Sequence, residues 1–231
     1  GIVYVLYGGP ESSFSNLTLS TTLNPATTGF TITGDAQGDW FGCSVSTAGD
    51  VNNDGYSDII IGAYMKSSGG TAYIIYGGPR SSFQNIALIS VTLNPMTNGF
   101  KVTGFGGAFF GYSVSTAGDV NNDNYDNIII GAPSYGAAFV IYGGPKSSLP
   151  NIEIYFTTFD PLNNGFMVEG DAVNYAFGSK VSTAGDVNND DYDDIIIGAP
   201  AKNGGRGAAY LIYGGPKTSL QNINLYFNTL N

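Results

Sequence analysis

The nine residues Asp50-Val51-Asn52-Asn53-Asp54-Gly55-Tyr56-Ser57-Asp58 carry oxygen-bearing side chains at positions 1, 3, 5 and 9 and lead directly into three isoleucines. The same pattern recurs at residues 119–127 and 186–194, each time followed by three isoleucines. Carboxylate and amide oxygens at this spacing are the ligands that a hard cation such as Ca²⁺ requires, and position 7 can add a backbone carbonyl. Three copies in one register predict three cation-binding loops.

These loops differ from an EF-hand, in which a helix follows the loop and a glutamate at position 12 binds the ion. Position 12 is Ile61, Ile130 or Ile197, and the β-branched runs around these residues predict strands. We therefore expect calcium loops that connect β-strands and hold up to three Ca²⁺ ions. The expected ligands are Asp50, Asn52, Asp54, Tyr56 and Asp58; Asp119, Asn121, Asp123, Tyr125 and Asn127; and Asp186, Asn188, Asp190, Tyr192 and Asp194.

A solvated turn is the alternative explanation for one such loop, because Asp and Asn side chains cap turns and tolerate left-handed backbone. The three loops contain eleven of the 18 acidic residues, three in each of the first two and five in the third. Carboxylates gathered so densely repel one another unless a cation neutralises them. The density and the repeated register together favour the metal interpretation.

Other markers recur with nearly the same period. Tyr-Gly-Gly-Pro begins at Tyr7, Tyr76, Tyr142 and Tyr213, at intervals of 66 to 71 residues. The first period contains four segments of strand-like sequence, at residues 29–34, 44–48, 58–63 and 71–76, with a short extra strand at residues 86–89. Repeated four-stranded antiparallel sheets predict an all-β fold with the blades of a β-propeller.

The phase of the repeats predicts a single array over residues 1–231. Its units run over about residues 8–76, 77–142 and 143–213, with a partial repeat at each end. Closed propellers have about four to eight blades. Three full periods therefore suggest part of a larger protein, or a subunit that completes its sheets with another copy. The apolar segments 2–7 and 223–227 contain no charged residue, so we expect them to seek neighbouring strands.

The combined markers resemble the FG-GAP repeat. Phe-Gly at Phe41, Phe110 and Phe177 precedes each acidic loop by nine residues, and Gly-Ala follows each loop, with proline after it in the second and third copies. This repeat forms the propeller head of integrin α subunits and occurs in bacterial surface proteins. The resemblance implies that positions 1, 3, 5 and 9 bind calcium through side chains and position 7 through its carbonyl. The departures are Tyr64 after the first Gly-Ala, Asn124 and Asp191 for the loop glycine, and Asn127 for the last loop Asp.

Three classes of function can be compared. An enzyme is disfavoured, because the chain has no histidine, its only cysteine has no partner base and most carboxylates lie in the loops. A binding or adhesion module for a protein or glycan is favoured, with Trp40, Phe105, Phe109 and Tyr175 as a candidate rim, unless these rings pack between blades. The alternative is a structural subunit of an extracellular filament or surface fibre that binds further copies of itself.

The expected environment is the cell surface or the extracellular space, where calcium is abundant enough for open carboxylate loops. A net charge of −10 argues against nucleic acid as a partner. No uninterrupted apolar stretch of about 18 residues exists, so we expect no membrane insertion in this segment. Asn16 begins the sequon Asn-Leu-Thr, a weak signal for glycosylation.

Overall fold

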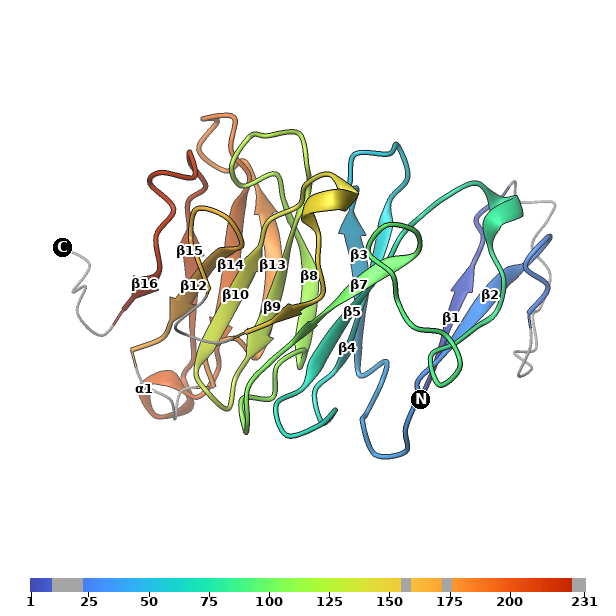
Figure 1. The fold of residues 1–231 in the computed structure, drawn as a ribbon. Helices are drawn as coiled ribbons and strands as arrows, with labels where there is room; N and C mark the ends of the chain where they lie inside the picture. Colours follow the sequence, from blue (N-terminus) through green and yellow to red (C-terminus); the bar gives the residue numbers. More distant parts are fainter. Residues whose placement is uncertain (10–22, 155–158, 172–175, 226–231) are drawn as a thin grey trace.

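The computed structural model describes residues 1–9, 23–154, 159–171 and 176–225, and these residues form β-sheets with only short helical turns (Figure 1). The strands are β1 (Ile2–Leu6), β2 (Gly29–Thr33), β3 (Ser44–Gly49), β4 (Asp58–Ala63), β5 (Thr71–Ile75), β6 (Ile86–Ala87), β7 (Gly99–Thr103), β8 (Ser113–Gly118), β9 (Asn127–Ala132), β10 (Ala137–Ile141), β11 (Ile152–Glu153), β12 (Gly165–Glu169), β13 (Lys180–Gly185), β14 (Asp194–Ala199), β15 (Ala208–Ile212) and β16 (Ile223–Asn224). The turns are η2 (Arg80–Ser82), η3 (Lys146–Ser148) and α1 (Lys202–Gly205).

The strands form four sheets, which we call blades. Their strand orders are β1-β2-β6, β11-β7-β5-β4-β3, β16-β12-β10-β9-β8 and β13-β14-β15. In Figure 1 the N-terminal blade is in blue on the right, the second blade follows beside it, and the third and C-terminal blades overlap on the left. The all-β fold with propeller-type blades is therefore confirmed, and the described blades form an open row rather than a closed ring.

The central strands of the two middle blades are buried on both faces, which explains their uninterrupted apolar sequence. All six residues of β9 and all five of β5 and β10 are buried. In these two blades, the three isoleucines after each acidic loop therefore pack toward the interior from both faces of the sheet, although successive side chains point to opposite faces. Phe110 is fully buried beside Phe139, with ring centroids 5.5 Å apart.

Each complete blade combines strands from successive sequence periods. The segments predicted at residues 29–34, 44–48, 58–63 and 71–76 are all strands, within a residue at each end. However, β2 pairs with β1 rather than with β3 to β5, and β5 pairs instead with β7 from the next period. The four strands predicted within one period therefore belong to two blades.

A short parallel strand adds a fifth member to each middle blade. β11 pairs in parallel with β7, and β16 pairs in parallel with β12, over two residues each. β6 makes the same contact with β2, so the extra strand predicted at residues 86–89 is confirmed at Ile86–Ala87. The expectation of about four antiparallel strands holds for the main body of these blades, and the fifth strand is the addition.

The terminal segments each have one neighbouring strand in this fold. β1 lies at the edge of the first blade and β16 at the edge of the third, while residues 226 and 227 lie outside the described part.

The β13–β15 blade is exposed where its counterparts are covered. Ile196 is 39% exposed, whereas its equivalents Ile60 and Ile129 are fully buried. Within the described residues, no helix is long and apolar enough to span a bilayer.

Candidate metal centres

The three acidic loops occupy equivalent places in successive blades. Loop 1 (residues 50–58) connects β3 to β4, loop 2 (residues 119–127) connects β8 to β9, and loop 3 (residues 186–194) connects β13 to β14. β8 packs against both β3 and β13, so the loops lie at the same end of neighbouring strands. An open cleft between loops 1 and 2 is lined by Asp50, Asp119, Asp123 and Asp126.

The backbone of all three loops makes the same turn. Position 4 has positive φ in every copy, and it is always asparagine, one of the residues that tolerates this region best. Position 6 also has positive φ, at Gly55 (87°), Asn124 (68°) and Asp191 (69°). Replacement of the glycine by Asn124 and Asp191 therefore leaves the turn intact, because short polar side chains adopt the left-handed conformation more easily than others.

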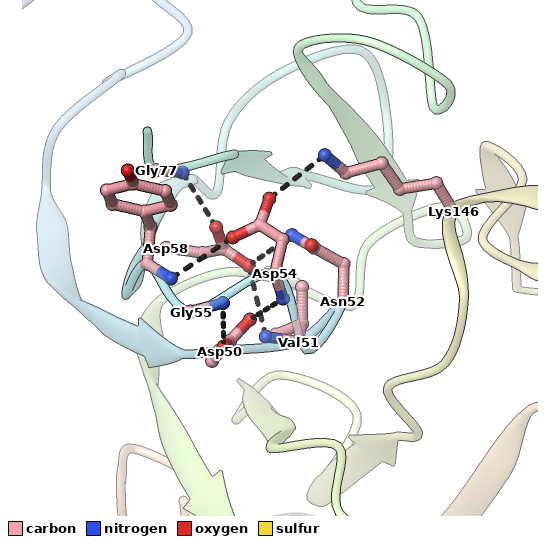
Figure 2. Close-up of polar contacts among 9 residues, drawn as sticks. Asp50, Val51, Asn52, Asp54, Gly55, Asp58, Gly77 and Lys146 are labelled. Carbon is pink, nitrogen blue, oxygen red and sulfur yellow. Dashed lines mark hydrogen bonds and ion pairs between the residues drawn. The ribbon is translucent and has the colours of Figure 1, made fainter. Parts of the chain in front are cut away.

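Backbone N–H groups hold the carboxylate at position 1 (Figure 2). In loop 1, the N–H groups of Asp54 and Gly55 donate to the two carboxylate oxygens of Asp50, at 3.0 and 2.8 Å. The N–H of Tyr56 donates to Asp54 Oδ1 at 3.1 Å. Loops 2 and 3 repeat all three contacts, with Asp119 and Asp186 at position 1. The loops are therefore Asx-type turns that bring positions 1 and 5 together.

Position 9 is buried in all three loops. Asp58 accepts hydrogen bonds from the N–H groups of Gly77 (2.7 Å) and Val51 (3.0 Å), and Asp194 accepts the equivalent pair. Burial raises the pKa of Asp58 to about 7; the two N–H donors oppose this shift, and the Asp54 and Asp50 carboxylates add to it. Asn127 instead donates from Nδ2 to the Tyr125 carbonyl at 2.7 Å. A carboxylate that is unfavourable to ionise alone suits a position beside a cation.

An unpaired oxygen at position 3 fits a metal ion. Asn52 and Asn121 are each 7% exposed, and their Oδ1 atoms are buried without a hydrogen-bond partner. Each of these side chains points its amide nitrogen at the position-9 side chain of its own loop. Buried polar atoms nearly always have hydrogen-bond partners, so we expect each of these unpaired acceptors to contact a cation or a water molecule. The oxygen-only donor set and these carbonyls together fit Ca²⁺.

The predicted ligands gather loop by loop, but their carboxylates do not converge on one point. Among the described residues, no three acidic, histidine or cysteine side chains form a ready metal cluster. Loop 3 is also more open, since Asn188 is exposed where Asn52 and Asn121 are buried. Its amide donates to Asp190 Oδ2 at 2.9 Å. Calcium binding would therefore require the carboxylates of a loop to move closer together around the ion.

Four residues that were not predicted from the sequence link the loops to the next blade. Asp126, at position 8 of loop 2, accepts a hydrogen bond from the N–H of Asp50 at 2.7 Å, and Asp193 does the same for Asp119 at 2.9 Å. Lys146 Nζ lies 2.9 Å from Asp54 Oδ2, and Lys217 Nζ lies 2.7 Å from Asp123 Oδ2. The available signal was the basic residue that follows Gly-Gly-Pro at residues 80, 146 and 217.

The predicted aromatic rim divides into exposed and packed rings. Trp40 is 61% exposed and Phe109 38% exposed, and both have positive φ. Phe105 instead packs edge-on against Tyr135, with ring centroids 4.9 Å apart, so it belongs to the interior between blades. Tyr175 and the sequon residue Asn16 lie outside the described residues. Trp40 and Phe109 precede β3 and β8, at the strand ends opposite the acidic loops.

A search of protein-family models found the FG-GAP repeat at residues 41–75, 110–146 and 177–212, which include the three acidic loops. The chain contains three FG-GAP repeats. Each matched segment begins at the Phe of Phe-Gly, runs through the acidic loop and ends at or just beyond the third strand of a blade. Each matched segment therefore contains the first three strands of a blade, and the next strand of a complete blade, β7 or β12, lies between that segment and the following one.

Curated relatives of this FG-GAP chain include several integrin α subunits. Integrin alpha-PS2 of Drosophila melanogaster is 30% identical over 185 residues, which cover 74% of this chain and 12% of that protein. Integrin alpha pat-2 of Caenorhabditis elegans is 30% identical over 188 residues, covering 76% and 14%. Integrin alpha-6 of Gallus gallus is 29% identical over 164 residues, covering 69% and 13%. The chain thus spans only a small part of the relatives that it matches.

Proposed function

We propose that this FG-GAP chain is a calcium-stabilised, non-catalytic module for adhesion or binding outside the cell. Its partner would be a protein or a glycan at the cell surface. The observation that carries the proposal is the threefold recurrence of one oxygen-rich loop at the same end of successive blades, with an orphaned, buried Asn carbonyl in loops 1 and 2. The similarity to integrin α subunits supports adhesion and a surface location.

Calcium would act as a structural ion in this proposal. Asp50, Asn52 and Asp54 would hold it in loop 1, with their counterparts in loops 2 and 3, and the position-9 side chains would close each site. The bound ion would neutralise carboxylates that otherwise repel. Rigid loops at one end of the blades would leave the opposite end, where Trp40 and Phe109 are exposed, for contact with a partner.

A thermal melt of the full chain, with calcium and with a chelator, tests the proposal. Binding to the folded state alone stabilises by RT ln(1 + [L]/Kd), about 2.7 kcal/mol per site at a hundredfold excess over Kd. We expect a higher melting temperature with calcium. The matched control is the triple variant Asp54→Ala, Asp123→Ala and Asp190→Ala, which should lose the shift. An unchanged midpoint in the unmodified chain would refute calcium stabilisation.

A second candidate function is that of a subunit in an extracellular fibre. One observation favours it: Ile196, Leu211 and Tyr213 are 39 to 57% exposed on the last blade, whereas their counterparts in the middle blades are buried. Such a face suits another blade, which a further copy of the chain would supply. Analytical ultracentrifugation with calcium distinguishes the two functions, because ordered polymers would favour the fibre and a discrete monomer would favour the binding module.

A further inference from the structure

Two lysines of the Gly-Gly-Pro turns reach back to the acidic loops of the preceding blade. Lys146 follows β10, yet its ammonium contacts Asp54 of loop 1, 92 residues away in sequence, at 2.9 Å (Figure 2). Lys217 follows β15 and contacts Asp123 of loop 2 in the same way, at 2.7 Å. Both aspartates stand at loop position 5, where a calcium ligand is expected. Each lysine ammonium therefore supplies, beside the position-5 carboxylate, part of the positive charge that a calcium ion would bring.

Each ammonium also lies over an aromatic ring, so it has a second partner close by. Lys146 Nζ is 5.1 Å from the ring centroid of Tyr76, and Lys217 Nζ is 4.8 Å from that of Tyr142. A cation above a tyrosine face is attracted by the ring quadrupole. The lysines are also partly exposed, at 31% and 35% of the side chain, so water can solvate them. An ammonium that leaves the aspartate is therefore not stranded in an apolar interior.

Loop 3 differs from the other two loops in this respect. Within the described residues, no lysine or arginine forms an ion pair with Asp190, the position-5 aspartate of loop 3. Loop 3 also carries two additional carboxylates, Asp191 and Asp193. Its negative charge is therefore the least compensated by the protein itself.

We propose that Lys146 and Lys217 are internal counter-ions that compete with calcium for Asp54 and Asp123, so that each lowers the calcium affinity of the loop in the preceding blade. This inference rests on the proposed calcium binding and goes beyond it. Calcium entry into loop 1 or loop 2 displaces the ammonium from the position-5 carboxylate and leaves it over the tyrosine ring. Among the described residues, loop 3 has no such competing lysine.

Competition follows from charge. Asp54 Oδ1 already accepts the N–H of Tyr56, and the lysine takes Oδ2, so the lysine occupies the carboxylate oxygen that lacks a backbone donor. A divalent ion that binds this carboxylate would lie within a few ångströms of the ammonium, and like charges at that distance repel. Exposed ion pairs are worth about 0.2–1 kcal/mol. Removal of the positive charge should thus tighten calcium binding about 1.4- to fivefold.

The test is a calcium titration of the full, calcium-stripped chain followed by ¹H–¹⁵N NMR. The amides of Gly55, Asn124 and Asp191 report on loops 1, 2 and 3 respectively, because each donates to the position-1 carboxylate of its own loop. We expect Lys146→Met to tighten calcium binding by loop 1 about 1.4- to fivefold and to leave loop 3 unchanged. Lys217→Met should do the same for loop 2. Lys146→Arg keeps the charge and should keep the wild-type affinity.

Lys101→Met is the matched control, since Lys101 is an exposed lysine of β7 that forms no ion pair with the loop carboxylates. A second measurement needs no variant: the ¹³Cε resonance of Lys146 should shift with the same midpoint as the Gly55 amide. An unchanged or weaker loop 1 in Lys146→Met, or a Lys146 resonance that ignores calcium, would overturn the competition alone. A wild-type chain in which no loop binds calcium would overturn the proposed function as well.

Discussion

The hydrogen bond from the N–H of Asp50 to Asp126 is a sharp test of how neighbouring blades are joined. Asp126 stands at position 8 of loop 2, outside the expected ligand set, and its Oδ2 accepts this bond at 2.7 Å. Its side chain lies directly against Gly49, where an added Cβ would collide with it. Asp126→Ala would remove this link and leave both expected calcium sites with their own ligands.

The expected loss of stability combines two opposing effects. A hydrogen bond to a charged group contributes about 1.5–3 kcal/mol. Against this, burial and then the nearby Asp119, Asp193 and Asp50 carboxylates raise the pKa of Asp126, so its removal relieves repulsion in the calcium-free protein. We expect a net loss of about 1–2 kcal/mol without calcium. At about 2–4 °C per kcal/mol for a chain of this length, the melting temperature should fall by about 2–8 °C.

Calcium should enlarge the loss, because a bound cation cancels the repulsion and leaves only the missing hydrogen bond. The assay is urea denaturation with calcium and with a chelator, at matched ionic strength. Asp126→Asn retains an oxygen acceptor and should lose less than Asp126→Ala. Ser57→Ala, at the equivalent exposed position of loop 1, should stay within about 0.5 kcal/mol. Equal stability of Asp126→Ala and the wild type in both conditions would show that the contact does not join the blades.

Three further predictions concern the loops and the core. Loop 2 should bind calcium most weakly, because Asn127 lacks the charge of Asp58 and Asp194. Calorimetric calcium titration of Asp54→Ala, Asp123→Ala and Asp190→Ala checks this ranking, which fails if Asp123→Ala removes the tightest phase of calcium binding. Without calcium, the free energy of unfolding should fall as pH rises from about 4 to 7. The raised pKa of Asp58, about 7, lets the folded state hold a proton that the unfolded state releases in this range. Asp58→Asn should flatten this pH dependence, and an equal slope in both proteins would contradict the prediction. Phe110→Ala should lower the free energy of unfolding by about 3–5 kcal/mol in urea denaturation, because it leaves a cavity at a fully buried site. Phe109→Ala, at the neighbouring position that is 38% exposed, should cost far less. Similar losses of stability in the two variants would argue against the assigned burial.

Local pattern was enough to predict the strands and the loops, because both depend on residues close in sequence. Alternation, isoleucine runs and Gly-Gly-Pro located β2 to β5 within a residue at each end. The turn at position 6 was also predictable, and it persists at Asn124 and Asp191. These features follow from side-chain periodicity and backbone sterics, which act over a few residues.

Partners distant in sequence could not be predicted in the same way. Nothing in the Gly29–Thr33 segment indicates whether it pairs with the strand before it or with those after it, and the structure shows that it pairs with β1. The sequence pattern located the two-residue strand β6, but it did not indicate that β6, β11 and β16 each pair in parallel with a strand of the preceding period. The contact between Lys146 and Asp54 joins residues from different repeats, so it emerges only once the blades are stacked.

The offset between sequence period and blade also bears on how such a chain can change length. β7 belongs to the second period but completes the sheet that contains β3, β4 and β5, so each period contributes strands to two adjacent blades. If a gene gains or loses one whole period of 66 to 71 residues, each strand after the junction takes the place of its equivalent, whichever residue of the period the recombination point falls on. A recombination event therefore need not respect a blade boundary, and only the length of the exchanged segment has to match.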